Sequence, residues 1–134
     1  MSELQNAKEF FANDLYATDA TGIVIDEVGE NYARCSLKLE RKHQNAVGHV
    51  MGGVMFTMAD FTFAVSTNRN GNITVSTVAQ ISHLASPKGD TLYAESRLLK
   101  NGNRTCFYQV DITDNTGALI AVVSFTGTKI KEIR

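Results

Sequence analysis

The stretch from Met51 to Asn68, MGGVMFTMADFTFAVSTN, limits most strongly what this chain can fold into. After the two glycines, apolar residues cover every side of a helical wheel, so the pattern predicts a buried helix and not an amphipathic surface helix. One carboxylate, Asp60, lies near the middle of that helix. A buried charge is costly unless it is paired or hydrogen-bonded. Asp60 is therefore either a functional group or a residue that needs a partner.

The rest of the chain predicts a single α+β domain spanning residues 1–134. Ser2 and Gln5 match a capping box, and apolar residues at helical spacing follow, so we expect an N-terminal helix over about 3–14. The central helix is expected over about 53–68. A hairpin before it and four strands after it alternate with a period of two. Because short turns join these strands, the five or six strands should form an antiparallel sheet wrapped around the central helix.

The alternation also predicts which strand residues are buried. Cys35 and Cys106 are interpreted as small buried strand residues, because their spacing suits neither a disulfide framework nor a metal site. In the first strand after the central helix, one set of alternating residues is expected to share the buried face: Ile73, Val75, Ala79 and Ile81.

Composition excludes several kinds of partner. Lys and Arg number 13 against 14 Asp and Glu, a net charge of −1, so neither nucleic acid nor an anionic membrane is an expected partner. The central apolar stretch is too short to cross a bilayer. The first residues lack a secretory signal, which predicts a cytoplasmic protein. No metal is expected, because the histidines and cysteines lack metal-ligand spacing.

The start of the central helix predicts a site. Gly52 and Gly53 let a ligand approach the backbone closely, and the first N–H groups of a helix lack intrahelical partners. They form a donor site for an oxyanion or a polarised carbonyl. Asp60 lies about two turns further on, roughly 12 Å along the axis, which is too far for one carbonyl to reach both within one chain. A two-fold dimer would bring the two groups together. The alternative is that the glycines only permit close packing and that Asp60 caps a neighbouring loop.

These residues resemble a known family. Asn45, Met51-Gly52-Gly53 and Asp60, followed by His83-Leu84-Ala85-Ser86-Pro87 and the 100–104 hairpin, are similar to the PaaI-type (phenylacetyl-CoA thioesterase-like) hotdog-fold thioesterases. The resemblance implies a hotdog fold and hydrolysis of acyl-CoA thioesters. It also implies homo-oligomers, dimers and a dimer of dimers forming a homotetramer, in which two subunits build each site. No cofactor is implied, since coenzyme A is part of the substrate.

The resemblance further implies a role for individual residues. Asp60 would be the nucleophile or the general base that activates water, with the Gly52 N–H polarising the carbonyl. Asn45 would position the water or the leaving thiolate. Ser76 matches a polar position that approaches the carboxylate in some relatives, and a slip of one residue would put Thr77 there instead.

Substrate-binding residues are expected at both ends of the substrate. Met51 and Gly53 would border the acyl group, while Lys100 and Arg104 would meet the phosphates of coenzyme A or would simply be solvated turn charges. The family usually has His where this chain has Met51, and His49 is the nearest histidine in sequence. A domain that binds acyl-CoA or acyl-lipid without catalysis therefore stands as the alternative function. Hydratase chemistry is disfavoured by the lack of a histidine on the central helix.

Overall fold

The computed structural model describes residues 2–69 and 71–130 of the chain. The elements follow in the order α1 (Glu3–Phe11), the π-helical segment η1 (Tyr16–Thr21), β1 (Val24–Gly29), β2 (Tyr32–Lys38), the 3₁₀ turn η2 (Arg41–His43), α2 (Gly52–Thr67), β3 (Ile73–His83), β4 (Thr91–Asn101), β5 (Thr105–Asp114) and β6 (Leu119–Ile130).

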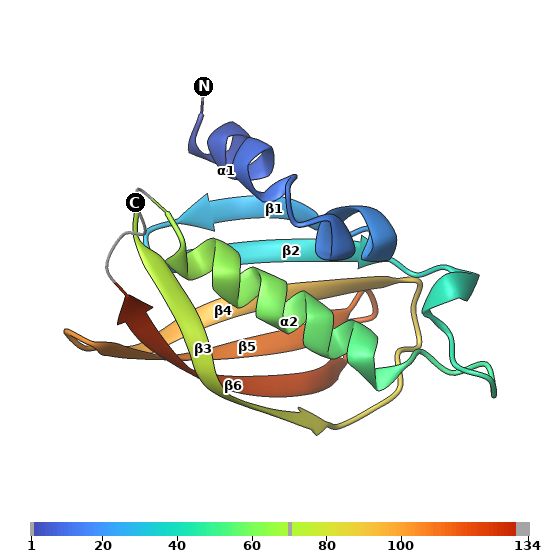
Figure 1. Cartoon of the computed structure of the whole chain (residues 1–134). Coiled ribbons are helices and arrows are strands. Elements are labelled where there is room, and N and C mark those ends of the chain that lie inside the picture. The colour runs from blue at the N-terminus through green and yellow to red at the C-terminus, as the bar shows by residue number, and fades with distance from the viewer. Residues whose placement is uncertain (1, 70, 131–134) are drawn as a thin grey trace.

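The six strands form one antiparallel sheet in the order β1-β2-β4-β5-β6-β3. The sheet curves around α2, which lies along its concave face, while α1 sits beyond the β1 edge (Figure 1). The α+β architecture predicted from the sequence is therefore confirmed, with six strands and a central helix that starts one residue before the expected 53 and ends at Thr67. Within the described residues, no helix is long and apolar enough to cross a bilayer.

Aromatic side chains fill the space between α2 and the sheet. The Phe63 ring stacks on Phe125 with centroids 4.7 Å apart and meets Tyr108 edge-on at 5.4 Å. A Cβ at Gly127 would lie 2.8 Å from the Phe63 ring, so only glycine allows β6 to approach the helix here. Cys35 and Cys106 are buried strand residues, as predicted.

The N-terminal helix packs on the same core. The capping box forms as predicted: the Ser2 hydroxyl accepts from the Gln5 N–H, and the Gln5 side chain accepts from the Ser2 N–H. Phe11 is buried and meets Phe61 of α2 edge-on, with centroids 5.7 Å apart. The helix ends at Phe11 and not near residue 14, because a turn follows in which the Asn13 side chain donates to the Phe10 carbonyl.

Strand β3 departs from simple alternation. A β-bulge between Ser76 and Val78 makes Thr77 an extra residue, and each bulge reverses which side chains face the helix. Thr74 is buried, whereas Val75 is exposed. The expectation that Val75 shares the buried face with Ala79 is therefore wrong, because the two residues lie on opposite sides of the bulge.

Candidate active site

The start of α2 presents free backbone donors. Met51 precedes the helix in an extended conformation and makes no side-chain capping hydrogen bond. Among the described residues, the N–H groups of Gly52 and Gly53 donate to no protein acceptor. Such groups carry the positive end of the helix dipole. The predicted donor site is thus open at this helix end.

A histidine that sequence reasoning did not assign to the site lies against these donors. A Cβ built on Gly52 would lie 3.0 Å from Cε1 and 3.1 Å from Nε2 of His83, the last residue of β3. His83 pairs with Ala121, which is buried beneath α2. Paired residues in an antiparallel sheet share a face, so His83 points toward the helix. Counting alternate residues backward from the end of β3, without crossing the bulge, would have placed His83 on the helix-facing side.

The loop before α2 holds Asn45 in a defined position. The Asn45 Oδ1 atom accepts from the N–H groups of Val47 and His49, both at 3.1 Å. Its side-chain NH₂ group is therefore the part left to bind a ligand. His43 anchors this loop: its Nδ1 accepts from the Glu40 N–H, which leaves Nε2 to donate to the Thr21 carbonyl at 2.8 Å.

Asp60 lies on the side of α2 that the sheet leaves open. Its side chain is exposed, as is Gly53 seven residues earlier on roughly the same side of the helix. One concave sheet covers only the other side of α2, so within one chain this face of the helix stays open. Partial removal from water raises the pKa of Asp60, and the nearby Asp14 carboxylate adds a smaller increase.

The Met51 side chain points into solvent, with the residue 58% exposed. His49 is held in the loop through its backbone, donating to Asn45 Oδ1 and accepting from the Asn45 N–H at 2.7 Å. The imidazole that contacts Gly52 is that of His83.

The bulge decides the orientation of Ser76. Ser76 pairs with Gly127, which faces Phe63 of α2, so Ser76 lies on the helix-facing side of β3. The hydroxyl of Thr77 donates to the Thr126 carbonyl at 3.1 Å and is engaged within the sheet. Of Ser76 and Thr77, the two residues that the sequence offered for this position, Ser76 is the one whose side chain lies on the α2 side.

Lys100 and Arg104 lie far from Gly52 within one chain. Their hairpin is beside the start of β3, since Lys129 pairs with Thr74 and donates its N–H to the Arg104 carbonyl. Gly52 contacts the other end of β3. Ten strand residues separate the two ends, roughly 33 Å. One chain therefore does not bring the basic hairpin to its own donor site.

Other reactive groups do not form a second centre. Burial raises the pKa of the Cys35 thiol to about 12 and also raises that of Cys106, so neither is a thiolate nucleophile near neutral pH. Across residues 2–69 and 71–130, no three His, Cys, Asp or Glu side chains gather as a metal ion would need.

Comparison with known proteins identifies the family. The model of the thioesterase superfamily matches residues 47–121, which include the end of the loop before α2, all of α2 and strands β3 to β5. The chain belongs to the thioesterase superfamily. It is 29% identical over 119 residues to acyl-coenzyme A thioesterase PaaI of Escherichia coli K12, covering 88% of this chain and 84% of that one. It is 34% identical over 91 residues to human acyl-coenzyme A thioesterase 13, covering 65% of each.

Solved thioesterase structures share the fold. The E. coli PaaI structure superposes with a TM-score of 0.83 at 24% identity, over 97% of this chain and 98% of that one. A thioesterase protein of Streptococcus pneumoniae TIGR4, solved with coenzyme A, gives 0.83 at 22% identity over 95% and 99%. The prediction of a PaaI-type hotdog thioesterase, a thioester hydrolase, is confirmed.

Proposed function

We propose that this thioesterase hydrolyses acyl-CoA thioesters to a carboxylic acid and free coenzyme A. The observation that carries the proposal is the open start of α2, where Gly52 lies against the His83 ring and its N–H has no acceptor among the described residues, with Asp60 exposed further along the same helix. Relatives of known activity support the substrate, since two of them are acyl-coenzyme A thioesterases.

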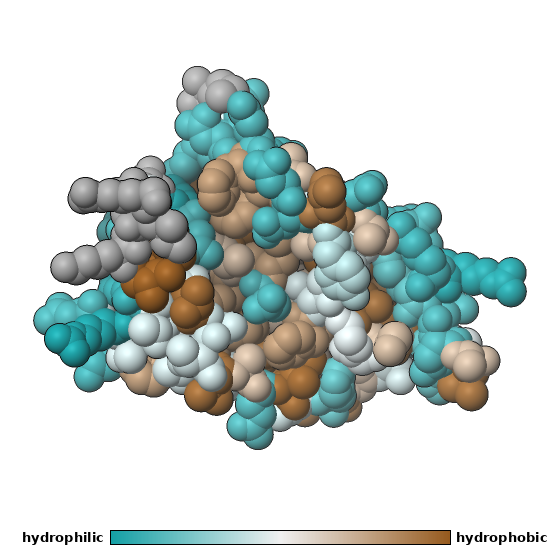
Figure 2. Space-filling view, in the orientation of Figure 1, coloured by the Kyte–Doolittle hydropathy of each residue, from teal (hydrophilic) through white to brown (hydrophobic). Residues whose placement is uncertain are grey.

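Two copies of the chain form each site in this proposal. Gly52 and Asp60 are eight residues apart on one helix, roughly 12 Å, so one carbonyl cannot reach both. Strand β3 is an edge of the sheet with unpaired backbone groups, and Val78 on it is 60% exposed. Figure 2 shows apolar and neutral surface over α2 and β3 with hydrophilic side chains around it. Such an edge and face favour pairing with a second copy.

A two-fold axis near the middle of β3 also accounts for the basic hairpin. Antiparallel pairing of two β3 strands sets the start of one beside the end of the other. The Lys100 and Arg104 hairpin of the second copy would then lie near the His83 end of the first, where it can bind the phosphates of coenzyme A. Exposed Phe107 on the outer face of the sheet, with exposed Leu99 at the bulge of the neighbouring strand β4, supports a further association of two dimers into a tetramer.

In the reaction, the thioester carbonyl oxygen accepts a hydrogen bond from the Gly52 N–H, and the His83 ring lies where it can donate a second one. Asp60 of the other subunit then removes a proton from water, whose oxygen attacks the carbonyl carbon. In the alternative, an Asp60 carboxylate oxygen attacks that carbon, the thiolate leaves, and water hydrolyses the mixed anhydride to the carboxylic acid and free Asp60. The C–S bond breaks when the tetrahedral intermediate collapses. A thiol has a pKa near 8.5, so the thiolate leaves without a general acid, and the Asn45 NH₂ group can donate to its sulfur.

A binding module is the second candidate, favoured by the exposed Met51 at the position where the family usually has histidine. Release of free thiol from acyl-CoA distinguishes the two functions. Tight acyl-CoA binding without turnover across acetyl, phenylacetyl and decanoyl thioesters would select the binding module. A cytoplasmic location is also proposed, supported by the two free cysteines.

The role of Asp60 is tested with Asp60→Asn, which keeps size and polarity but removes the base. We expect thiol release to fall by roughly 10²–10⁴-fold with little change in affinity for free coenzyme A. Asp19→Asn, an exposed carboxylate on η1, is the matched control and should retain the parent rate. A rate for Asp60→Asn within threefold of the parent would show that this carboxylate is not the catalytic base or nucleophile.

A further inference from the structure

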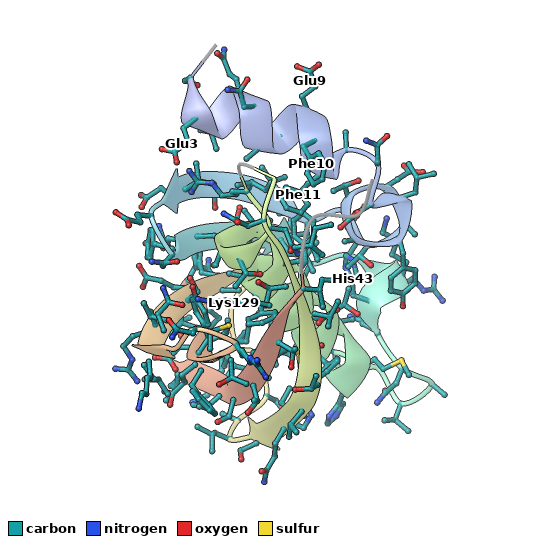
Figure 3. The ribbon with its side chains drawn as sticks, turned by 60° about the vertical axis from the view of Figure 1, so that its left-hand side comes forward. Glu3, Glu9, Phe10, Phe11, His43 and Lys129 are labelled. Carbon is teal, nitrogen blue, oxygen red and sulfur yellow. The ribbon has the colours of Figure 1, made fainter. Side chains whose placement is uncertain are left out.

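A cavity of about 610 Å³ lies between α1 and the C-terminal half of α2. Most of its wall is apolar, and the residues that matter here are Ala7, Phe10, Phe11, Ala64, Asn68 and Ile73. Figure 3 shows Phe11 directed from α1 toward the body of the molecule, whereas Glu9 is directed away from it. The volume lies within the range of pockets that hold small organic ligands.

The cavity begins beside the proposed base. Ala64 is one helical turn beyond Asp60 and lies on the same side of α2. Asp14, on the other wall, is close enough to raise the pKa of Asp60. The cavity therefore continues from the catalytic carboxylate along α2 toward Arg69, over roughly 13 Å of helix axis.

An ion pair lies at the far end of the cavity. Arg69 of the segment after α2 pairs with Glu3 at the start of α1 and also donates to the Gly29 carbonyl. Together with the edge-on contact of Phe11 and Phe61, this pair holds α1 over the cavity. The helix lies outside residues 47–121, which match the thioesterase superfamily. This wall is thus contributed by a segment beyond the matched part of the fold.

We propose that this cavity binds the acyl group of the thioester and that α1 is the wall that selects its length. The proposal rests on the proposed hydrolase function. The occupant is an uncharged acyl group, because Glu3 neutralises Arg69, the one Arg or Lys among the lining residues that the structure describes, and Asp14 repels a second carboxylate. A substrate then spans two subunits. Its acyl group lies against the subunit that supplies Asp60, and its thioester carbonyl lies at Gly52 of the other subunit.

Two substitutions alter the cavity in different ways. Ala64→Leu narrows it next to Asp60, and Phe10→Ala removes a wall residue that is 62% exposed and so should not disturb folding. Each methylene that loses apolar contact is worth about fourfold in affinity. We expect each variant to bind decanoyl-length groups about tenfold more weakly and acetyl-length groups normally. Tyr16→Ala, an exposed aromatic at the start of η1 that does not line the cavity, is the control.

The probes are S-alkyl-CoA thioethers, which cannot be hydrolysed, titrated calorimetrically as the ethyl, hexyl and decyl compounds with free coenzyme A as reference. The parent should bind the decyl compound most tightly, and both cavity variants should lose that preference while keeping their affinity for free coenzyme A. Identical chain-length dependence in the parent and both variants would overturn the proposal. Because binding is measured, this result is independent of whether thiol is released, which tests the hydrolase function separately.

Turnover gives a second readout where hydrolysis is observed. Succinyl-CoA carries a terminal carboxylate on the same four-carbon skeleton as butyryl-CoA, and we expect its kcat/KM to be at least tenfold lower. Equal kcat/KM values for these two thioesters would contradict the assignment of an uncharged occupant.

Discussion

The most quantitative prediction concerns Asp114, at the end of β5. This carboxylate is only 2% exposed. Its Oδ2 accepts from the N–H groups of Lys88 and Gly89 at 2.8 and 3.1 Å. Its Oδ1 accepts from the N–H and hydroxyl of Thr116 and from the Ala118 N–H. One side chain therefore joins the β5–β6 turn to the loop that follows His83, and so helps to fix the strand end that borders the site.

Replacing Asp114 with Asn leaves one oxygen and turns the other position into an NH₂ donor that faces N–H groups. At least two hydrogen bonds to a charged acceptor are lost, each worth about 1.5–3 kcal/mol. Because Lys88 and Thr116 are exposed and water can replace part of each bond, we expect the lower end, a loss of about 3 kcal/mol. For a chain of this size that corresponds to a fall in melting temperature of about 10 °C.

The same bonds give the prediction a pH dependence. Hydrogen bonds from Thr116 first, and from the Lys88 and Gly89 N–H groups, hold the pKa of Asp114 well below its usual range. A carboxylate whose folded-state pKa is lowered stabilises the protein above its unfolded pKa of about 3.9. That stabilisation is lost as the pH falls through the folded-state value. The difference between parent and variant should therefore be constant from pH 5 to 8 and shrink by about 1 kcal/mol by pH 3.

Urea unfolding of the parent and of Asp114→Asn at several pH values measures this difference. Asp111→Asn is the matched control, because Asp111 is on the same strand but accepts one side-chain hydrogen bond, from Gln109 at 3.0 Å. It should lose less than about 1 kcal/mol. A loss below 1 kcal/mol for Asp114→Asn at pH 7, or a difference unchanged down to pH 3, would refute the reasoning.

Two further predictions concern the catalytic groups. Asp14→Asn removes a negative neighbour and lowers the pKa of Asp60. Because kcat/KM falls as Asp60 is protonated, the acidic limb of its pH profile should move to lower pH. An acidic limb at the parent pH would show that Asp14 does not affect Asp60, and Asp19→Asn is the control. His83→Ala should reduce kcat by roughly 10²-fold if the ring donates to the carbonyl oxygen, whereas Met51→His should change it by less than about threefold because the space beside Gly52 already contains an imidazole. Thiol-release kinetics measure both, and a large gain in Met51→His would show that His83 does not fill that role.

The sequence predicted the fold well because hydrophobic periodicity is a local property. The all-apolar pattern after Gly53 and the period-two strands required a helix enclosed by a sheet, and the turn residues required antiparallel pairing. Gly52 and Asp60 were singled out as candidates for a related reason: unusual residues in an otherwise uniform apolar helix are visible without any tertiary information.

What the sequence did not reveal depends on packing between distant segments. The bulge at Thr77 is one extra residue whose effect is to exchange the two faces of β3, and no local pattern distinguishes it from regular alternation. The burial of His43 depends on the Thr21 carbonyl, 22 residues away in sequence. The cavity under α1 exists only because Phe11 contacts α2 and Glu3 pairs with Arg69, two residues after the end of α2.

The bulge also sets which face of β3 carries His83. If Thr77 instead paired regularly with Thr126, every later residue would shift by one position in register, and His83 would face the side of the sheet away from α2. With the bulge, Ser76 and His83 both face the helix. In the proposed site, the His83 imidazole of the facing strand lies against Gly52, and a glycine at this position leaves room for it. Insertion of one residue between Val78 and His83 should therefore turn His83 away from α2 and lower thiol release more than any conservative change at Met51, whereas deletion of Thr77 should remove only the bulge and leave His83 on the helix side.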